Sequence, residues 1–219
     1  QLAKRKLRGI NCTIPHKKAV IPLLEEIDTA ARDLHSVNTV AFRDGKAIGY
    51  NTDILGFAAS LTRDGVTLRG KKVLLLGYGG AASVMAYHCV TQGAYVTITG
   101  RNLDKAAALQ KQLCAAVPGA HVAVFSRRHI PRDIQIVLNS TPVGMYPKES
   151  TAPLHYLPHK TEYVFDAIYN PPVTATMKLA NHKKTKTRDG LYMLVMQAAH
   201  AQTIWSGVQF EPQACETIL

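Results

Sequence analysis

The central part of the chain alternates short apolar runs with segments of helical spacing. Val73 to Leu76 is a continuous apolar run, which is typical of a strand buried on both faces of a parallel sheet. A glycine-rich turn and an alanine-rich helix follow it directly. Further strands are expected over 94–99, 122–125, 134–139 and 163–167, and further helices over 103–116 and 173–181. This alternation predicts a doubly wound α/β sheet.

The first fifty residues carry a different pattern. A short strand is expected over 7–14, and residues 18–27 place apolar side chains on one face of a helix. Two apolar runs, 38–43 and 46–50, flank the pair Asp44-Gly45, which is typical of a tight β-hairpin turn.

Two more helices are expected beside these elements. One covers 54–63, with Thr52 or Asp53 as its N-cap. The other begins after Gly190 and covers 191–205 as one long helix. No internal repeat or low-complexity tract interrupts this order.

Composition and charge exclude several classes of protein. The chain has 219 residues, of which 47% are hydrophobic, and this is enough for a core in one large or two small domains. Its 26 basic and 15 acidic residues give a net charge of +11. The basic residues, Arg127-Arg128 among them, are spread out and are not interleaved with aromatic residues as in a nucleic-acid module. We expect most of these basic residues to be solvated and one or two of them to bind phosphate.

The cysteines and the apolar runs narrow the classes further. Cys12, Cys89, Cys114 and Cys215 lie far apart and show no zinc-ligand spacing. We therefore expect neither a metal site nor a disulfide framework, and we infer a reducing compartment. No apolar run is long enough to cross a bilayer.

The segment Gly77-x-Gly79-x-x-Ala82 lies between a buried strand and a helix. Gly77 permits a tight turn, Gly79 lets the backbone approach a pyrophosphate, and Ala82 allows close packing of the helix on the strand. The N–H groups at the start of the helix are donors for an anion. We favour a dinucleotide site here over a glycine turn without a ligand.

The end of the following strand indicates which dinucleotide binds. NAD enzymes place Asp or Glu there to bind the ribose 2′-hydroxyl. This chain has Arg101 and Asn102 instead, with Lys105 one turn further on. A guanidinium suits a 2′-phosphate, so we expect NADP. Asp104 lies close by and is the feature that argues against this choice.

Two polar segments, 11–17 and 51–53, carry the candidate chemistry. Lys17 offers an ammonium and Asp53 a carboxylate, each among small polar side chains that suit a polyhydroxylated substrate. Taken singly, Lys17 is explained as a surface charge and Asp53 as a helix cap. Taken together, they favour proton transfer on a small sugar-like acid.

Seven ordered segments resemble the shikimate dehydrogenase family, and they extend over nearly the whole chain. They are residues 9–17, 37–40, 49–56, 77–82, 139–145, 166–171 and 189–197. The resemblance implies a reversible, NADP-dependent reduction of 3-dehydroshikimate to shikimate, on the pathway to aromatic amino acids.

The resemblance also implies roles for individual residues. Lys17 and Asp53 are the expected catalytic pair, and no metal is expected. The expected substrate ligands are Asn11, Thr13, Asn38, Tyr169 and Gln197. The expected cofactor-binding residues are Gly77, Gly79, Gly80, Ala81, Arg101, Asn102, Lys105, Ser140, Thr141, Gly190 and Met193.

The resemblance implies two α/β lobes. We expect a substrate lobe of residues 1–53 and 190–219, to which the C-terminal helix returns, and a Rossmann-type NADP lobe of residues 54–189. The family pattern begins with a loop whose two serines bind the substrate carboxylate, and this chain starts after that segment, so we expect an incomplete substrate lobe. Gly100-Arg101-Asn102 also replaces the family's Asn-Arg-Thr, and Tyr192 stands where glycine is common.

The expected partner is the small-molecule substrate, shikimate or 3-dehydroshikimate, with no nucleic acid and no membrane. We expect a monomer or homodimer, alone or within a multifunctional pathway enzyme, in the cytoplasm, or in a plastid if a targeting segment precedes Gln1. Two alternatives stay open. One is a quinate/shikimate dehydrogenase with relaxed cofactor use, and the other is a non-catalytic NADP- or ligand-binding relative or fragment.

Overall fold

The computed structural model describes residues 7–180 and 185–216. The chain divides into two compact units, Gln1–Ala59 with Tyr192–Leu219 and Ser60–Leu191. The division expected from the sequence falls after residues 53 and 189 instead. Residues 1–6 and 217–219, which belong to the expected substrate lobe, lie outside the described part.

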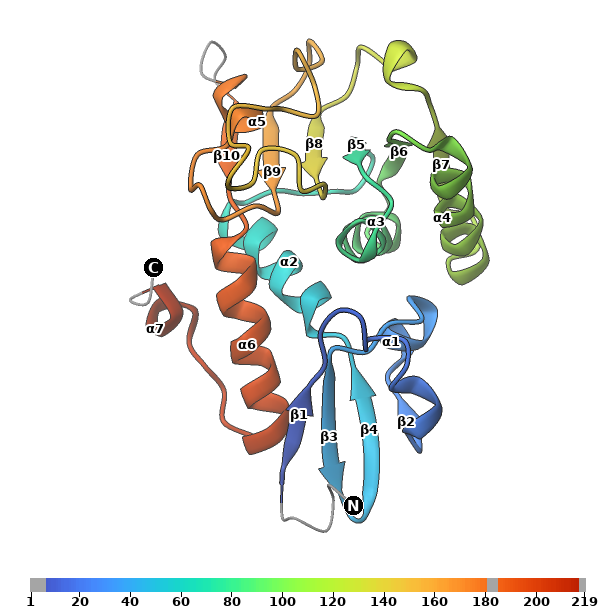
Figure 1. Ribbon diagram of the computed structural model, residues 1–219, viewed down its shortest axis with the longest axis vertical. Helices are drawn as coiled ribbons and strands as arrows, with labels where there is room; N and C mark the ends of the chain where they lie inside the picture. The colour runs from blue at the N-terminus through green and yellow to red at the C-terminus, as the bar shows by residue number, and fades with distance from the viewer. Residues whose placement is uncertain (1–6, 181–184, 217–219) are drawn as a thin grey trace. The chain divides into compact units, whose positions relative to one another are not determined.

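The first unit is built on a four-stranded sheet with the order β1-β3-β4-β2 (Figure 1). The strands are β1 (Gly9–Asn11), β2 (Glu26–Ile27), β3 (Thr39–Arg43) and β4 (Lys46–Tyr50). β3 pairs antiparallel with β1 and β4, whereas β2 pairs parallel with β4. Asp44 (φ 51°) and Gly45 (φ 78°) both take the left-handed conformation that a tight hairpin needs, so the hairpin prediction is confirmed.

The helical elements of this part of the chain differ in length. They are η2 (Ile21–Leu23), α1 (Thr29–Asp33), α2 (Thr52–Arg63), α6 (Leu191–Ser206) and α7 (Pro212–Glu216). Ala31, Val37 and Val40 are fully buried and form the core of the sheet with half-buried neighbours such as Ile10 and Phe42.

The helix expected over 18–27 is wrong. Only the 3-10 turn η2 forms, and Glu26–Ile27 is strand β2. Pro22 lies in the first turn of η2, where its missing N–H is tolerated, whereas an interior position in a longer helix would cost a hydrogen bond. Leu23, which the helical pattern places on the apolar face, is 73% exposed.

The expected cap of α2 is also wrong. α2 begins at Thr52, and the Asn51 side-chain oxygen accepts a hydrogen bond from the Asp53 N–H at 3.1 Å. Asn51 therefore caps the helix, and Asp53 lies inside its first turn. The favourable helix dipole at this end stabilises the Asp53 carboxylate.

Two other expected elements are shorter in the structure. The strand expected over 7–14 is reduced to β1, because only its three residues pair with β3. The helix expected over 173–181 is reduced to α5 (Ala175–Lys178), because the Thr174 hydroxyl caps it by accepting from the Met177 N–H at 3.3 Å. Residue 181 lies outside the described residues.

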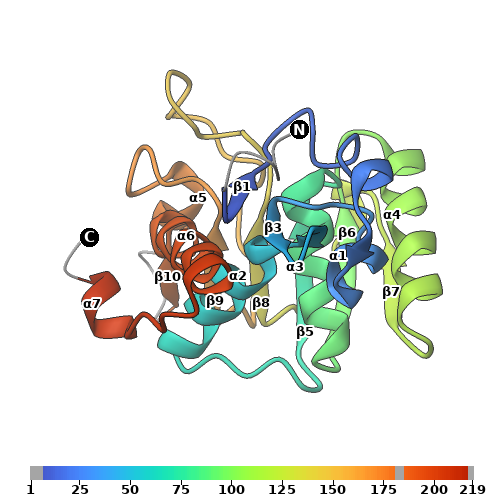
Figure 2. The ribbon, with the colours of Figure 1, turned by 90° about the horizontal axis from the view of Figure 1, so that it is seen from below.

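The second unit is a six-stranded parallel sheet with the order β10-β9-β8-β5-β6-β7. Its strands are β5 (Lys72–Leu76), β6 (Tyr95–Thr99), β7 (His121–Val124), β8 (Ile136–Asn139), β9 (Tyr163–Asp166) and β10 (Lys186–Arg188). Its helical elements are α3 (Gly80–Thr91), α4 (Leu103–Ala116), η3 (Arg127–His129) and α5. α3 packs on β5 and β6, and α4 packs on β6 and β7 (Figure 2).

This topology confirms the doubly wound α/β fold. The first strand of the unit, β5, has β6 on one side and β8 on the other, so the direction of winding reverses there. Ligands of such sheets bind at this reversal, beyond the carboxyl ends of the strands. Val73 to Leu76 are at most 2% exposed, which confirms the expected buried strand.

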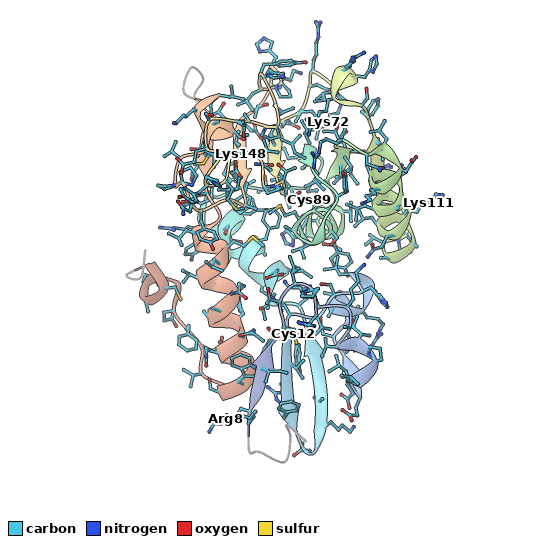
Figure 3. The ribbon with its side chains drawn as sticks, in the orientation of Figure 1. Arg8, Cys12, Lys72, Cys89, Lys111 and Lys148 are labelled. Atoms are coloured by element: carbon cyan, nitrogen blue, oxygen red, sulfur yellow. The ribbon has the colours of Figure 1, made fainter. Side chains whose placement is uncertain are left out.

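All four cysteines are free thiols. Cys89, labelled on α3 in Figure 3, is fully buried, and burial raises the pKa of its thiol. Cys114 is exposed.

A buried carboxylate fixes the edge of the second sheet. Asp64, whose side chain is 1% exposed, pairs with Arg188 and with Lys186 of β10, and accepts from the Tyr163 hydroxyl at 2.8 Å. Burial acts to raise the pKa of Asp64, but the hydrogen bonds from Arg188, Tyr163 and Lys186 prevail and hold that pKa below its ordinary value of 3.8. The short, charged strand β10 is thus held to the sheet partly through one carboxylate.

We expect Asp64→Asn to lower the free energy of unfolding at pH 7 by about 3 kcal/mol, because it leaves the half-buried Arg188 without its counter-charge. The lowered pKa of Asp64 means that its contribution is complete above the unfolded-state pKa and is lost as the pH falls through the folded-state value. The stability difference, measured by urea unfolding from pH 7 downwards, should therefore shrink below about pH 4.

The matched control is Asp133→Asn, which removes a surface ion pair with Lys72 and should change stability much less. A difference between wild type and Asp64→Asn that widens on acidification would contradict this account.

Gly56 lets α2 and α6 approach closely. A Cβ atom at this position would overlap the Met193 carbonyl oxygen and would lie 3.0 Å from the backbone nitrogen of Gln197. The obstacles are backbone atoms, which cannot rotate away. The contact therefore sets the position of the turn of α6 that carries Gln197.

We expect Gly56→Ala to destabilise the protein by about 1–2 kcal/mol through overpacking, despite the higher helix propensity of alanine. Gly80→Ala, the same change at the start of α3, meets no atom within 4 Å and serves as the control. Thermal unfolding of both variants checks this. Equal stability of the two variants would show that the α2–α6 contact has room for a methyl group.

Candidate active site

The predicted catalytic pair is an ion pair in the first unit. The Lys17 ammonium donates to Asp53 Oδ2 at 2.5 Å, and the two side chains are 25% and 21% exposed. The side-chain amide of Asn38 donates to the other oxygen, Asp53 Oδ1, at 2.9 Å. Both carboxylate oxygens are therefore engaged, while the ammonium keeps partial access to solvent.

The hairpin brings these residues together. Asn38 stands directly before β3, and its N–H donates to the Tyr50 carbonyl at the end of β4 at 3.0 Å. α2 begins two residues after Tyr50, so Asp53 follows at once. The Lys17 carbonyl accepts from the Val37 N–H at 2.9 Å, which ties the preceding turn to the same point.

Asn38 is buried, and its side-chain amide has one fixed orientation. Its oxygen accepts from the Thr52 N–H at 2.8 Å and from the Thr39 hydroxyl at 3.0 Å. Since the oxygen is held by these donors, the NH₂ group must face Asp53. Asn38, predicted as a substrate ligand, is therefore placed to orient the carboxylate of Asp53.

The other substrate ligands predicted on this unit have different surroundings. Asn11 donates from its side chain to the Asn38 carbonyl and to the Thr39 hydroxyl, both at 3.2 Å. Gln197 accepts from the Thr52 hydroxyl at 3.5 Å. Thr13 is exposed, and its carbonyl accepts from the His16 N–H at 2.7 Å. The structure thus brings Asn11, Asn38 and Gln197 together around Thr39 and Thr52. These two threonines were not predicted as ligands.

The glycine turn of the second unit lies where β5 and β8 run side by side. Gly77 has φ 114°, and a Cβ atom there would lie 2.5 Å from the Ser140 hydroxyl oxygen, so only glycine fits. Ser140 donates from its hydroxyl to the Leu76 carbonyl at 2.6 Å, which fixes the loop after β8 against the turn. Gly80 and Ala81 form the first turn of α3, where backbone N–H groups lack intrahelical acceptors.

A hollow of about 200 Å³ opens beside this turn. Its lining residues are Gly77, Tyr78, Gly79, Gly100, Arg101, Arg127, Ser140, Thr141, Pro142 and Val143. Five of them are predicted cofactor residues, whereas Tyr78 and Arg127 are additions from the structure. Arg127 follows the strand next to β6, so the rule that ligands bind beyond the carboxyl ends of parallel strands could have identified it.

The remaining predicted cofactor residues lie outside this lining. Asn102 caps α4 by accepting from the Lys105 N–H at 2.9 Å. Gly190 donates its N–H to the Ile168 carbonyl at 3.0 Å, and a Cβ atom there would overlap the Ala167 carbonyl, so packing alone explains this glycine. Met193 lies half-buried on α6 in the first unit.

A buried network that the sequence did not reveal supports the loop after β8. Asn139 donates to Asp166 at 2.9 Å, and its oxygen accepts from the Thr141 N–H at 3.0 Å and hydroxyl at 2.7 Å. The Thr174 hydroxyl donates to the other Asp166 oxygen at 2.7 Å. Burial raises the pKa of Asp166, although these donors oppose the shift. The network fixes Thr141 in the wall of the hollow.

A second hollow of about 410 Å³ shares Ser140, Thr141 and Pro142 with the first. Tyr169, predicted as a substrate contact, lines it and is 50% exposed. The structure thus places Tyr169 on the same unit as the glycine turn. Within the described residues, no cluster of His, Cys, Asp and Glu could hold a metal ion, and no helix is long and apolar enough to cross a membrane.

Comparison with known proteins identifies the family. Residues 1–40 match the model of the shikimate dehydrogenase substrate binding domain, and residues 59–189 match that of shikimate / quinate 5-dehydrogenase. A shikimate dehydrogenase (NADP(+)) from Carboxydothermus hydrogenoformans is 39% identical over 204 residues, which cover 92% of this chain and 73% of the relative. The chain is thus shorter than this relative.

Solved structures agree with the sequence matches. Shikimate 5-dehydrogenase from Thermus thermophilus, in complex with NADP(H) and shikimate, has a TM-score of 0.84 at 30% identity and covers 99% of this chain and 78% of its own. Quinate dehydrogenase from Corynebacterium glutamicum, in complex with NAD, has a TM-score of 0.89 at 29% identity. The match covers 99% of this chain and 79% of the quinate dehydrogenase. The family models, the curated relative and the shared fold agree, and this chain belongs to the shikimate dehydrogenase family.

Proposed function

We propose that this protein is a shikimate dehydrogenase, which reduces 3-dehydroshikimate to shikimate reversibly with NADPH, on the route to aromatic amino acids. The observation that carries the proposal is the Lys17–Asp53 ion pair, held by Asn38 in a chain of this family. The glycine turn at Gly77 and the guanidinium of Arg101 support the choice of cofactor.

The proposed chemistry assigns one role to each member of the ion pair. NADPH supplies a hydride to the ketone carbon when it is bound. The Lys17 ammonium polarises the ketone oxygen and gives it a proton, so that the product is an alcohol and not an alkoxide. Asp53 holds the ammonium in place and stabilises its charge, and Asn38 holds Asp53. In the oxidation of shikimate, Lys17 takes the same proton back.

Small polar side chains near the pair suit the substrate hydroxyls. We assign Asn11, Thr13 and Gln197 to this task, with Tyr169 as a further contact. Asn11 and Gln197 are tied to the same threonine cluster as Asn38, so their amides are partly oriented before a ligand arrives. Preorganisation of this kind lowers the cost of binding.

The hollow beside Gly77 fits the adenosine end of NADP. Arg101 lines this hollow, and within the described part of the chain no acidic residue, Asp104 included, is in its lining. A guanidinium without a competing carboxylate favours a 2′-phosphate over a 2′-hydroxyl. The free N–H groups of Gly80 and Ala81 suit the pyrophosphate.

We expect Lys17→Met to lower kcat for shikimate oxidation by about 10²–10⁴-fold with little change in KM, because the proton donor is lost while the side-chain length is kept. Lys18→Met, an exposed neighbouring lysine, is the control and should keep wild-type rates. Steady-state kinetics of the purified protein measure both variants. An unchanged kcat for Lys17→Met would overturn the assignment. NADPH binding by a wild-type protein without any turnover would favour the non-catalytic alternative.

We expect Arg101→Ala to raise KM for NADP⁺ by about tenfold or more, since it removes a charge-assisted bond to the 2′-phosphate. KM for NAD⁺ should hardly change. Initial rates with each cofactor decide this. An equal rise in KM for both cofactors would show that Arg101 does not bind the 2′-phosphate.

A second candidate function is quinate/shikimate dehydrogenase with relaxed cofactor use. The structural likeness to a quinate dehydrogenase in complex with NAD favours it. We expect shikimate with NADP⁺ to give the higher kcat/KM. A comparable value for quinate with NAD⁺ would favour the second candidate.

The assembly state and the location stay predictions. We propose a monomer or homodimer, alone or within a multifunctional enzyme, in the cytoplasm. A solved relative from Clostridium acetobutylicum is a chorismate mutase/shikimate 5-dehydrogenase fusion, which supports the option of a larger pathway enzyme.

A further inference from the structure

Two arginines from neighbouring loops line the hollow beside the glycine turn. Arg101 follows β6, and Arg127 opens η3 shortly after β7. Because β6 and β7 are adjacent parallel strands, the loops at their carboxyl ends are neighbours. In the sequence, Arg127 is one of many dispersed basic residues and nothing distinguishes it from them. The fold brings it to the same hollow as Arg101.

Both guanidiniums are available for an anion. Each residue is exposed, and neither forms an ion pair with any residue of the described segments, 7–180 and 185–216. Among the residues that the structure describes, no acidic side chain lines the hollow. Two like charges that face one small space repel each other unless an anion lies near them, so this arrangement favours a ligand with a negative charge at this point.

Tyr78 gives the same hollow an aromatic wall. Its ring lies directly against Gly100, where a Cβ atom would be 2.6 Å from Tyr78 Cε1 and 2.8 Å from Cδ1. Gly100 therefore leaves room for the ring, and this explains the departure from the asparagine of the family pattern. An aromatic face beside two guanidiniums suits a planar base that carries a phosphate group nearby.

We infer that Arg127 is a second ligand of the cofactor's 2′-phosphate and that, together with Arg101, it determines the preference for NADP over NAD. This inference rests on the proposed function, because it requires NADP as the cofactor. It adds one charge from η3 to the single arginine that the end of β6 supplies.

The test uses the ligand pair 2′,5′-ADP and 5′-AMP, which differ only in the 2′-phosphate. Isothermal titration calorimetry measures the binding of each to the wild type and to three variants, without any turnover. Arg127→Ala should weaken 2′,5′-ADP about tenfold, the loss expected for one hydrogen bond to a charged group, and should leave 5′-AMP within about twofold.

Arg128→Ala is the matched control, since Arg128 lies in the same turn but does not line the hollow. It should keep wild-type affinity for both ligands. Arg101→Ala should lose 2′,5′-ADP affinity, as the proposed function requires.

The outcomes separate the inference from the proposed function. If Arg101→Ala weakens 2′,5′-ADP selectively and Arg127→Ala does not, the inference is wrong and the NADP proposal stands. If Arg127→Ala and Arg128→Ala cause equal losses, the effect comes from net charge alone, and the inference is also wrong. If the wild type binds both ligands equally, the proposed preference for NADP is wrong, and the inference is wrong as well.

Discussion

The candidate active site of the first unit depends on the side-chain amide of one buried asparagine. Asn38 accepts from the start of α2 and from Thr39 of β3 with its oxygen, and donates to Asp53 with its nitrogen. A buried amide that satisfies several partners has only one workable orientation, and leaving those partners unpaired costs about 1–3 kcal/mol each. The placement of Asp53, and through it of the Lys17 ammonium, follows from this orientation.

The second unit relies on a different constraint, which is the close approach of other atoms to the backbone of two glycines. Gly77 must turn within reach of the Ser140 hydroxyl, and Gly190 must pass the Ala167 carbonyl. Asn139 and the buried Asp166 then fix the loop that carries Thr141. Steric closeness and a satisfied polar network thus position the wall of the hollow before any cofactor binds, as preorganised sites require.

Much of this architecture follows from the sequence, because its patterns are local. The apolar run from Val73 to Leu76, the glycine turn after it and the Asp44-Gly45 hairpin each predict their structure within a few residues. The helix predicted over 18–27 is wrong because it rests on the helical spacing of the apolar residues alone. Pro22 and the pairing of Glu26–Ile27 with β4 determine the structure of this segment instead. The parts that sequence patterns did not reveal depend on contacts between distant residues. Asp166 meets Asn139 only when β8 and β9 are paired, and Arg127 meets the hollow only through the order of β5, β6 and β7.

We propose that Lys17 and Asp53 act as one catalytic unit. A double-mutant cycle of Lys17→Met and Asp53→Asn, read out as kcat for shikimate oxidation with NADP⁺, tests it most directly. We expect strong non-additivity, in which the double variant is no slower than the slower single variant. Losses that multiply, as for two independent residues, would contradict it.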